Sequence, residues 1–265
     1  MRHRDGLKRE PPAPDQSRNM ENRTENGMEI GLININTIND DKIIHMQNFT
    51  KNFHILNFNE LNIKNEQQLN VTTSDSDYTW YIIPKQNFVN KNNQTQQHEQ
   101  RIGFRIHNSI SQLYNIQIKE FKYLLQENRS SNQIDPCTVQ TLLYSVQHKN
   151  RLFNILVVYR TPDANPVNTL ALYNYMNECN AYFTLGDFNL DFSQKNIKKY
   201  ILEHTQLTQI VKKPTRVQTV QRSTGSTTSS TVIDHCYTRK TVAQDCKYSI
   251  LDFANPDFPD IKLTD

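Results

Sequence analysis

Acids and amides recur at the ends of the predicted strands, and they are the residues of this chain best suited to chemistry. They are Asn34, Asn36, Glu60, Asp187, Asn189 and Asp234. In a layered α/β fold the ends of strands converge on one crevice, where loops place polar groups over a rigid frame. Carboxylate and amide oxygens suit Mg²⁺ or Mn²⁺, ions that assist the cleavage of phosphate esters. The pattern therefore indicates a polar cluster for metal-assisted phosphate chemistry.

Each of these residues, taken alone, also has an ordinary structural explanation. Asn34 or Asn36 can simply end a strand, and Glu60 can be a surface acid. Asp187, which follows Gly186, can form an Asx turn. Only their joint placement favours a functional site.

The elements that must position this cluster are strands and helices mixed along the chain. Apolar runs predict strands at residues 29–36, 54–58, 78–83, 102–107, 113–118, 139–146, 153–159, 181–185 and 232–237. Helical spacing occurs at residues 40–50, 166–179 and 193–203. The first strand, helix and strand predict a parallel pair, and the number of strands favours two sheets. Residues 85–100 and 222–230 are polar and low in complexity, so we predict loops there, the second one not rigid.

The composition fits a folded domain with polar loops. Hydrophobic residues make up 36% of the 265 residues and charged residues 22%, unlike a wholly disordered chain. The formal net charge of +3 permits a polyanionic partner without requiring one. The longest apolar stretch, residues 152–159, is far shorter than the ~20 residues of a membrane-spanning helix. We therefore expect an intracellular protein without membrane association, whose four separated cysteines are free thiols.

The chain divides into a leader and a single domain. Residues 1–28 combine mixed charges with the proline-rich segment Pro11-Pro12-Ala13-Pro14 and predict a disordered leader. Residues 29–265 show no internal repeat and no boundary between two cores. We therefore expect one domain over residues 29–265.

Short motifs follow one another in a fixed order along this domain. They are Ile-Asn-Ile-Asn at 33–36, Ile-Leu-Asn-Phe-Asn-Glu at 55–60, Arg-Ile-Gly-Phe-Arg-Ile at 101–106, Val-Tyr-Arg-Thr-Pro at 158–162, Gly-Asp-Phe-Asn at 186–189, Lys-Pro-Thr-Arg at 213–216 and Ser-Thr-Val-Ile-Asp-His at 230–235. Together they resemble the motifs of the endonuclease/exonuclease/phosphatase superfamily. Within that superfamily, the closest resemblance is to the apurinic/apyrimidinic-like endonuclease domain of non-LTR (LINE-like) retroelements.

The resemblance implies a fold, a reaction and partners. The fold would be an α/β four-layered sandwich of two packed β-sheets flanked by helices. The reaction would be metal-dependent nicking of DNA phosphodiesters, with Mg²⁺ or Mn²⁺ as the cofactor and the nucleus as the place of action. In a full element, a reverse transcriptase or helicase region of the same polyprotein would be a partner besides DNA.

The resemblance also implies roles for single residues. Glu60 would be the main metal ligand, assisted by Asn36 and Asp265. Asn34 and Asn189 would hydrogen-bond the scissile phosphate, and Tyr159 would contact it. Asp187 would position or activate the attacking water, and Asp234 would orient a catalytic histidine. Substrate contacts would come from the loop residues Arg160, Thr215 and Arg216, with Lys212 and Lys213 as further cations unless these form only a solvated charged run.

The sequence departs from the family pattern at its end. The family's final motif is Ser-Asp-His, whereas this sequence ends at Leu263-Thr264-Asp265, so Asp265 matches the Asp and no residue matches the His. His235 is a poor substitute, because adjacent side chains of a strand point to opposite faces. We therefore expect a domain truncated at its C-terminus that lacks its last core strand, and its catalytic activity stays open.

Two other functions remain compatible with the sequence. One is another phosphoesterase of the same superfamily, such as a phosphomonoesterase or a sphingomyelin-type phosphodiesterase, although the motifs at 213–216 and 230–235 argue against it. The other is a decayed, non-enzymatic fragment that at most binds nucleic acid. Cleavage of supercoiled plasmid compared with lipid and inositol phosphates would separate the enzymes.

Overall fold

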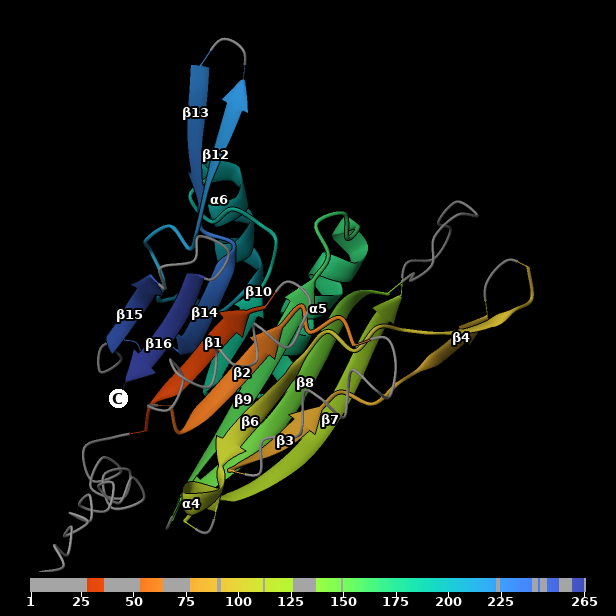
Figure 1. The fold of residues 1–265 in the computed structure, drawn as a ribbon, viewed down its shortest axis with the longest axis vertical. Helices are drawn as coiled ribbons and strands as arrows, with labels where there is room; N and C mark the ends of the chain where they lie inside the picture. Colours follow the sequence, from red (N-terminus) through yellow and green to blue (C-terminus); the bar gives the residue numbers. More distant parts are fainter. Residues whose placement is uncertain are drawn as a thin grey trace, which may run out of the picture.

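Two six-stranded β-sheets packed against each other make up most of the structure (Figure 1). It is a computed structural model, and it describes residues 28–35, 53–63, 77–89, 92–111, 113–125, 137–148, 150–222, 225–239, 243, 247–252 and 259–264. The predicted helix at 40–50 and all of the predicted leader except Met28 lie outside the described residues.

The first sheet carries the N-terminal strands. Its spatial order is β15 (Lys247–Asp252), β16 (Pro259–Thr264), β1 (Ile30–Asn34), β2 (Ile55–Asn59), β6 (Gly103–His107) and β3 (Tyr78–Ile82). Strands β1 and β2 are parallel, as predicted, and the other neighbours are antiparallel. Strand β1 is paired on both sides, with β2 and with the antiparallel β16.

The second sheet also contains one parallel pair. Its spatial order is β11 (Leu207–Gln209), β14 (Asp234–Arg239), β10 (Phe183–Asp187), β9 (Arg151–Arg160), β8 (Cys137–His148) and β7 (Asn115–Leu125). Strands β9 and β10 are parallel, and the remaining pairs are antiparallel. The carboxyl ends of β9 and β10 therefore lie side by side, as do those of β1 and β2.

Alternating side chains of the strands form the core. In β1, Ile30 and Leu32 point into the large cluster between the sheets, where they meet residues such as Val157 of β9. Ile33 points to the other face of the first sheet, into a smaller cluster with Phe58. Because both faces of β1 are buried, its sequence is an almost continuous apolar run instead of an alternating one.

Helices α5 (Pro166–Glu178) and α6 (Lys195–His204) pack together, and α5 lies against β8 of the second sheet (Figure 1). Both were predicted from their spacing. Asn165 caps α5, because its side chain accepts a 2.7 Å hydrogen bond from the backbone N of Asn168, and Pro166 occupies the first turn. The short helix α4 (Asn108–Ser111) links β6 to β7. The fold is thus an α/β sandwich with flanking helices, as the motifs implied.

The two predicted loops were wrong, since each contains a β-hairpin. Residues 85–100 include β4 (Asn87–Val89) paired with β5 (Thr95–Gln97). The Ser- and Thr-rich segment at 222–230 belongs mostly to β13 (Gly225–Thr231), which pairs along its length with β12 (Arg216–Arg222). Threonine favours strands, and the antiparallel partner satisfies the backbone of a segment whose polar side chains suggested a loop. Figure 1 shows this two-stranded ribbon projecting from the body of the molecule.

The described helices and cysteines bear on membrane association and on disulfide bonding. Among them, no helix is both long and apolar enough to cross a bilayer. Cys179 and Cys236, whose side chains are described, form no disulfide.

Candidate active site

The predicted polar residues meet where the two parallel strand pairs end. Across the second sheet, Asp187 lies opposite both Tyr159 of β9 and Asp234 of β14. Asn34, at the end of β1 in the first sheet, donates a 2.9 Å hydrogen bond from Nδ2 to Oδ2 of Asp187. This contact joins the two sheets, so residues that are 153 positions apart in the sequence form one cluster.

A sharp turn after β10 sets the direction of the Asp187 carboxylate. The backbone N of Asn189 donates a 2.8 Å hydrogen bond to Oδ1 of Asp187, which is the Asx turn considered from the sequence. Asn189 has a φ of 48°, a left-handed conformation that asparagine tolerates. Its Nδ2 donates one hydrogen bond to the carbonyl of Arg160, which leaves a second N–H for another acceptor. Asp187 is therefore both a turn residue and a member of the cluster.

Glycine is required at position 186 by the close approach of two strands. A Cβ atom there would lie 1.8 Å from the carbonyl oxygen of Val158, and the φ of Gly186 is 157°. No side chain fits this space. Gly186 therefore lets β10 approach β9 closely enough to set Asp187 beside Tyr159.

Glu60 leaves the end of β2 in an uncommon backbone conformation. Its φ is 53°, in the left-handed region that non-glycine residues seldom adopt. The next residue, Leu61, is fully buried and anchors the turn in the smaller core cluster. The Glu60 carboxylate meets the second sheet, where its Oε1 accepts a 3.3 Å hydrogen bond from the Tyr159 hydroxyl. Strain of this kind is common at functional sites.

Three carboxylates crowd this end of the sandwich. Burial raises the pKa of Asp187 well above its usual range, and the negative charges of Asp234 and Glu60 raise it further. Burial also raises the pKa of Asp234 to about 7, with a smaller contribution from Glu60 and opposing effects of Thr215 and Arg216. Oδ1 of Asp234 is buried and has no hydrogen-bond partner within the described part of the chain. Without a nearby cation, the surroundings of Asp187 and Asp234 therefore favour the protonated form of these carboxyls.

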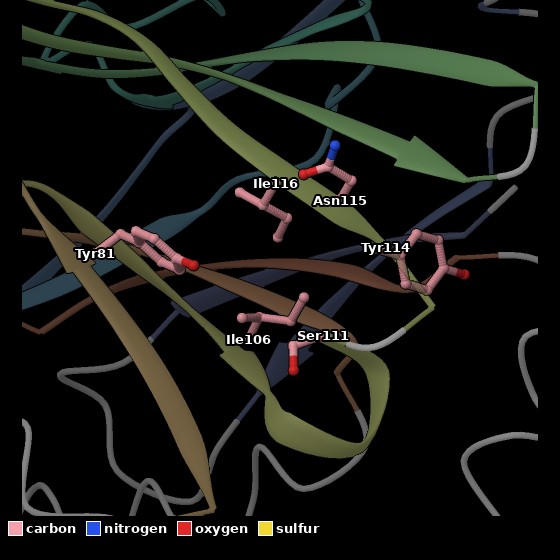
Figure 2. Close-up of a pocket in the computed structure, with 6 residues that line it drawn as sticks. All are labelled: Tyr81, Ile106, Ser111, Tyr114, Asn115 and Ile116. Carbon is pink, nitrogen blue, oxygen red and sulfur yellow. The ribbon is translucent and has the colours of Figure 1, made fainter.

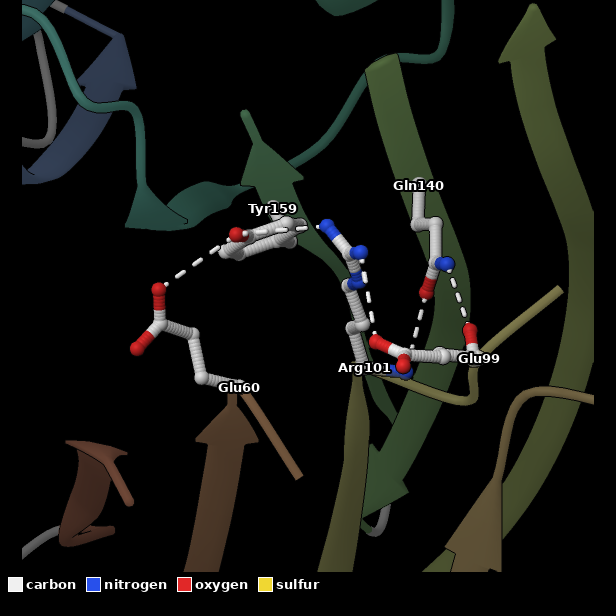
Figure 3. A network of polar contacts seen from close by, with 5 residues as sticks. All are labelled: Glu60, Glu99, Arg101, Gln140 and Tyr159. Atoms are coloured by element: carbon white, nitrogen blue, oxygen red, sulfur yellow. Dashed lines mark hydrogen bonds and ion pairs between the residues drawn. The ribbon is translucent and has the colours of Figure 1, made fainter. Parts of the chain in front are cut away.

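Tyr159 lies between Glu60 and Arg101 (Figure 3). Tyr159 is only 5% exposed, and this burial raises the pKa of its phenol, so the hydroxyl keeps its proton. Arg101, just before β6, places Nη1 3.4 Å from the phenol oxygen. Sequence reasoning gave Arg101 no role, because its contact depends on how the two sheets pack.

Two predicted substrate contacts have internal partners instead. The guanidinium of Arg160 is buried and donates to Oγ1 of Thr169 and to the carbonyls of Ala164 and Phe188. Arg160 thus supports the turn that carries Asp187. Thr215 is buried as well.

The hydroxyl of Thr215 accepts hydrogen bonds from the backbone N of Ile233 and of Asp234. It therefore fixes the start of β14. Arg216 remains a candidate for substrate contact. It is exposed at the start of β12, and its charge lowers the pKa of both Asp187 and Asp234.

The histidine that follows Asp234 has a structural place. His235 is fully buried, with Nε2 2.8 Å from the carbonyl of Leu190 and Nδ1 2.7 Å from the hydroxyl of Tyr237. Burial lowers its pKa to about 4, so the imidazole is neutral, and it stacks on Phe188. As expected from strand alternation, it does not serve as the partner of Asp234.

The described residues supply part of a donor set for a metal ion. Predicted ligands Asn36 and Asp265 lie outside the described residues, and within those residues no three His, Cys, Asp or Glu side chains form a complete site. The hard carboxylate oxygens of Glu60, Asp187 and Asp234 nevertheless suit Mg²⁺, which binds through one or two carboxylates and retains several waters. Such an ion would stabilise the ionised form of these buried carboxyls.

A separate cavity of about 350 Å³ lies at the opposite end of the sandwich (Figure 2). It is lined by Tyr81, Ile106, Ser111, Tyr114, Asn115 and Ile116. Ile106 pairs with Ile55 at the start of β2, whereas Glu60 follows the end of that strand. None of the predicted site residues lines this cavity.

Several solved structures have a fold similar to that of this chain. Neither a scan against family models nor a search of curated proteins found a match. Among solved structures, the endonuclease domain of TRAS1, a telomere-specific non-LTR retrotransposon, has a TM-score of 0.59 and 8% identity, covering 89% of this chain and 97% of that one.

Two further structures have similar scores. The apurinic/apyrimidinic (AP) endonuclease of Leishmania major has a TM-score of 0.60 and 10% identity, covering 91% of this chain and 88% of that one. TDP2 of D. rerio, complexed with a single-stranded DNA product, has a TM-score of 0.55 and 9% identity, covering 89% and 98%. At such identities the likeness concerns the fold. The chain has the fold of the endonuclease/exonuclease/phosphatase superfamily, the group that its motifs resemble.

Proposed function

We propose that this chain is a metal-dependent phosphodiesterase that nicks DNA. The 2.9 Å hydrogen bond between Asn34 and Asp187 carries the proposal, since it brings a neutral amide of one sheet to a buried carboxylate of the other. Glu60, Tyr159 and Asp234 surround this pair. Neutral amides can hold a phosphate without repelling it, and carboxylates beside them can bind a cation and move a proton.

The chemistry of the cluster suits a divalent cation. Glu60 would hold it, with Asn36 and Asp265 as further ligands. When bound, Mg²⁺ or Mn²⁺ would supply positive charge against the scissile phosphate and the leaving alkoxide. The raised pKa values of Asp187 and Asp234, caused mainly by burial, and the unpartnered Oδ1 of Asp234 support this assignment, because a cation would stabilise the ionised form of these buried carboxyls.

Asp187 is the candidate for activating water. Its oxygens accept hydrogen bonds from Asn34 and Asn189, which fix the direction of the carboxylate. Burial and its acidic neighbours raise its pKa, and a carboxylate with a raised pKa is a stronger base. The second N–H of the Asn189 side chain, beside Asp187, is the candidate donor for a phosphate oxygen, whereas the Tyr159 hydroxyl donates to Glu60.

DNA is the substrate that the other observations favour. The β12–β13 ribbon starts at Arg216 beside the cluster, and a two-stranded ribbon fits the major groove of DNA. The TRAS1 neighbour is an endonuclease domain, and the TDP2 neighbour holds a DNA product. These likenesses support a nucleic-acid substrate in preference to a lipid or an inositol phosphate.

A plasmid-nicking assay tests the proposal. Supercoiled plasmid should be converted to the open circle with Mg²⁺ or Mn²⁺ and not with a chelator. Asp187→Asn should lower the rate by about 10²- to 10⁴-fold, the usual contribution of a general base. The matched control is Asp163→Asn, because Asp163 is an exposed carboxylate on the loop after β9.

Parallel assays separate the alternatives. If the protein hydrolysed sphingomyelin or inositol phosphates and did not nick plasmid, its substrate would be one of these compounds and not DNA. Fluorescence anisotropy that shows DNA binding, together with no hydrolysis of any substrate, would refute the enzymatic proposal and favour a nucleic-acid-binding fragment.

A further inference from the structure

A chain of polar contacts links the two sheets (Figure 3). It runs from Glu60, after β2 of the first sheet, to Tyr159 in β9 of the second sheet, and on to Arg101, before β6 of the first sheet. The Tyr159 hydroxyl lies 3.3 Å from Oε1 of Glu60, and Nη1 of Arg101 lies 3.4 Å from the same hydroxyl. We propose that Arg101 is a positioning residue that orients the Glu60 carboxylate through Tyr159. The inference rests on the proposed function, because it concerns the residue that would hold the metal ion.

The direction of the two hydrogen bonds follows from the chemistry of the groups. A guanidinium has donors and no acceptor, so the phenol oxygen must accept from Arg101. The phenol has a single proton, which is then directed to Oε1 of Glu60. Within the described part of the chain, Oε2 of Glu60 accepts no hydrogen bond and stays available for a cation. Without Arg101, the phenol proton would have no fixed direction.

Arg101 is itself held from several sides. Its backbone N donates a 3.0 Å hydrogen bond to Oε1 of Gln140, whose Nε2 donates to the carbonyl of Glu99 at 2.7 Å. Its Nη2 pairs with the Glu99 carboxylate at 3.2 Å, and its side chain is only 16% exposed. Gln140 is also the cross-strand neighbour of Tyr159. The guanidinium and the phenol therefore share one support in β8.

A second link joins Arg101 to the turn at Glu60. The backbone N of Leu61 donates a 3.1 Å hydrogen bond to the carbonyl of Arg101. Arg101 thus stabilises the backbone after Glu60 with its main chain and the carboxylate of Glu60 with its side chain. A substitution at position 101 leaves the first link in place and removes the second. Side-chain variants therefore isolate the role proposed here.

Manganese affinity, measured by isothermal titration calorimetry, tests the role. Arg101→Met and Tyr159→Phe should each weaken Mn²⁺ binding by about 10-fold, within the usual effect of losing a partner that orients a ligand. The double variant should bind no more weakly than Tyr159→Phe alone, because Arg101 acts through the phenol. Arg151→Met, at an exposed arginine at the other end of β9, is the matched control and should bind as the unchanged protein does.

Losses that add in the double variant would overturn the proposal, as would unchanged affinity in Arg101→Met. Melting curves without metal show whether each variant is folded. If Arg101→Met is unfolded, Arg101→Lys replaces it. Lysine keeps the charge and loses the forked donor geometry, so a smaller loss of Mn²⁺ affinity is expected.

A second measurement separates this inference from the proposed function. In metal-free protein with ¹³C-labelled tyrosine, the signal missing from Tyr159→Phe identifies the Tyr159 Cζ. That signal should move in Arg101→Met and in Glu60→Gln, and stay in Arg151→Met. If it moves while the unchanged protein binds no Mn²⁺, the positioning role holds and the metal site is wrong. If it stays in Arg101→Met, the positioning role is wrong whatever the metal does.

Discussion

Replacing Asp234 with asparagine should make the metal-free protein more stable at alkaline pH and less active. Asp234 is 3% exposed, and burial raises the pKa of its carboxyl from 3.8 to about 7. As the pH rises between these values, the unfolded chain loses this proton before the folded chain does. The folded state then binds more protons, so its stability falls as the pH rises.

The size of the effect follows from the two pKa values. A folded-state pKa of about 7 against 3.8 corresponds to a loss of about 4 kcal/mol once the pH is above both. About 3 kcal/mol of it should appear between pH 5 and pH 8. Asparagine carries no charge, but its buried amide can lack an acceptor, which costs about 1–3 kcal/mol. A net gain of about 1–3 kcal/mol is therefore expected at pH 8.

Calorimetric unfolding in a chelating buffer measures this difference. For a domain of this size each kcal/mol shifts Tm by about 2–4 °C, so Asp234→Asn should melt several degrees higher at pH 8 and gain less at pH 5. Asp163→Asn, at an exposed carboxyl, is the control for the loss of one acidic side chain. A gain for Asp234→Asn that is equal at both pH values would refute the reasoning. The same variant should nick DNA more slowly, because a buried carboxylate that lowers stability is expected to have a role in the proposed activity.

The remaining predictions concern the metal, the close strand contact and the unpartnered oxygen. Mn²⁺ should raise the Tm of the unchanged protein, and Glu60→Gln should abolish this shift; an equal shift in the variant would place the ion elsewhere. Gly186→Ala should cost at least about 3 kcal/mol, because its Cβ would strike the Val158 carbonyl at 1.8 Å, whereas Gly31→Ala should cost less because it meets only side-chain atoms of Leu56 and Phe53. Equal losses in urea unfolding would contradict this distinction. Added imidazole should speed plasmid nicking, because Oδ1 of Asp234 lacks a donor, and it should not do so in Asp234→Asn.

The sequence predicts the frame of the site well because strong patterns encode it. The apolar runs at β1, β2, β9 and β10 and the spacing of α5 and α6 identify these elements without knowledge of their packing. The motif residues Asn34, Glu60, Tyr159, Asp187, Asn189 and Asp234 meet because both parallel pairs end on the same side. Polar hairpins such as β12–β13 are not predicted from the sequence. Their strands are held by hydrogen bonding to each other and carry no alternation of apolar residues that would identify them.

The roles of single polar residues are harder to predict. The positive charge of Arg160 suggested a contact with substrate. The turn after β10 instead places the carbonyl of Phe188 against its guanidinium. Arg101 gains its partners only through the cross-strand position of Gln140 beside Tyr159. Both outcomes depend on tertiary geometry, which local sequence does not specify.

The hydrogen bond between Asn34 and Asp187 makes the site a reporter of docking between the two sheets. Each partner sits on a different sheet, so neither sheet alone contains both the amide and the carboxylate. A folding intermediate with one sheet formed would have native strands and no assembled site. If the chain were divided between β7 and β8, Asn34 and Glu60 would lie on one fragment and Asp187 and Asp234 on the other. The proposed activity would return only when the fragments reassociate. Recovery of the proposed activity would then report the docking of the two sheets.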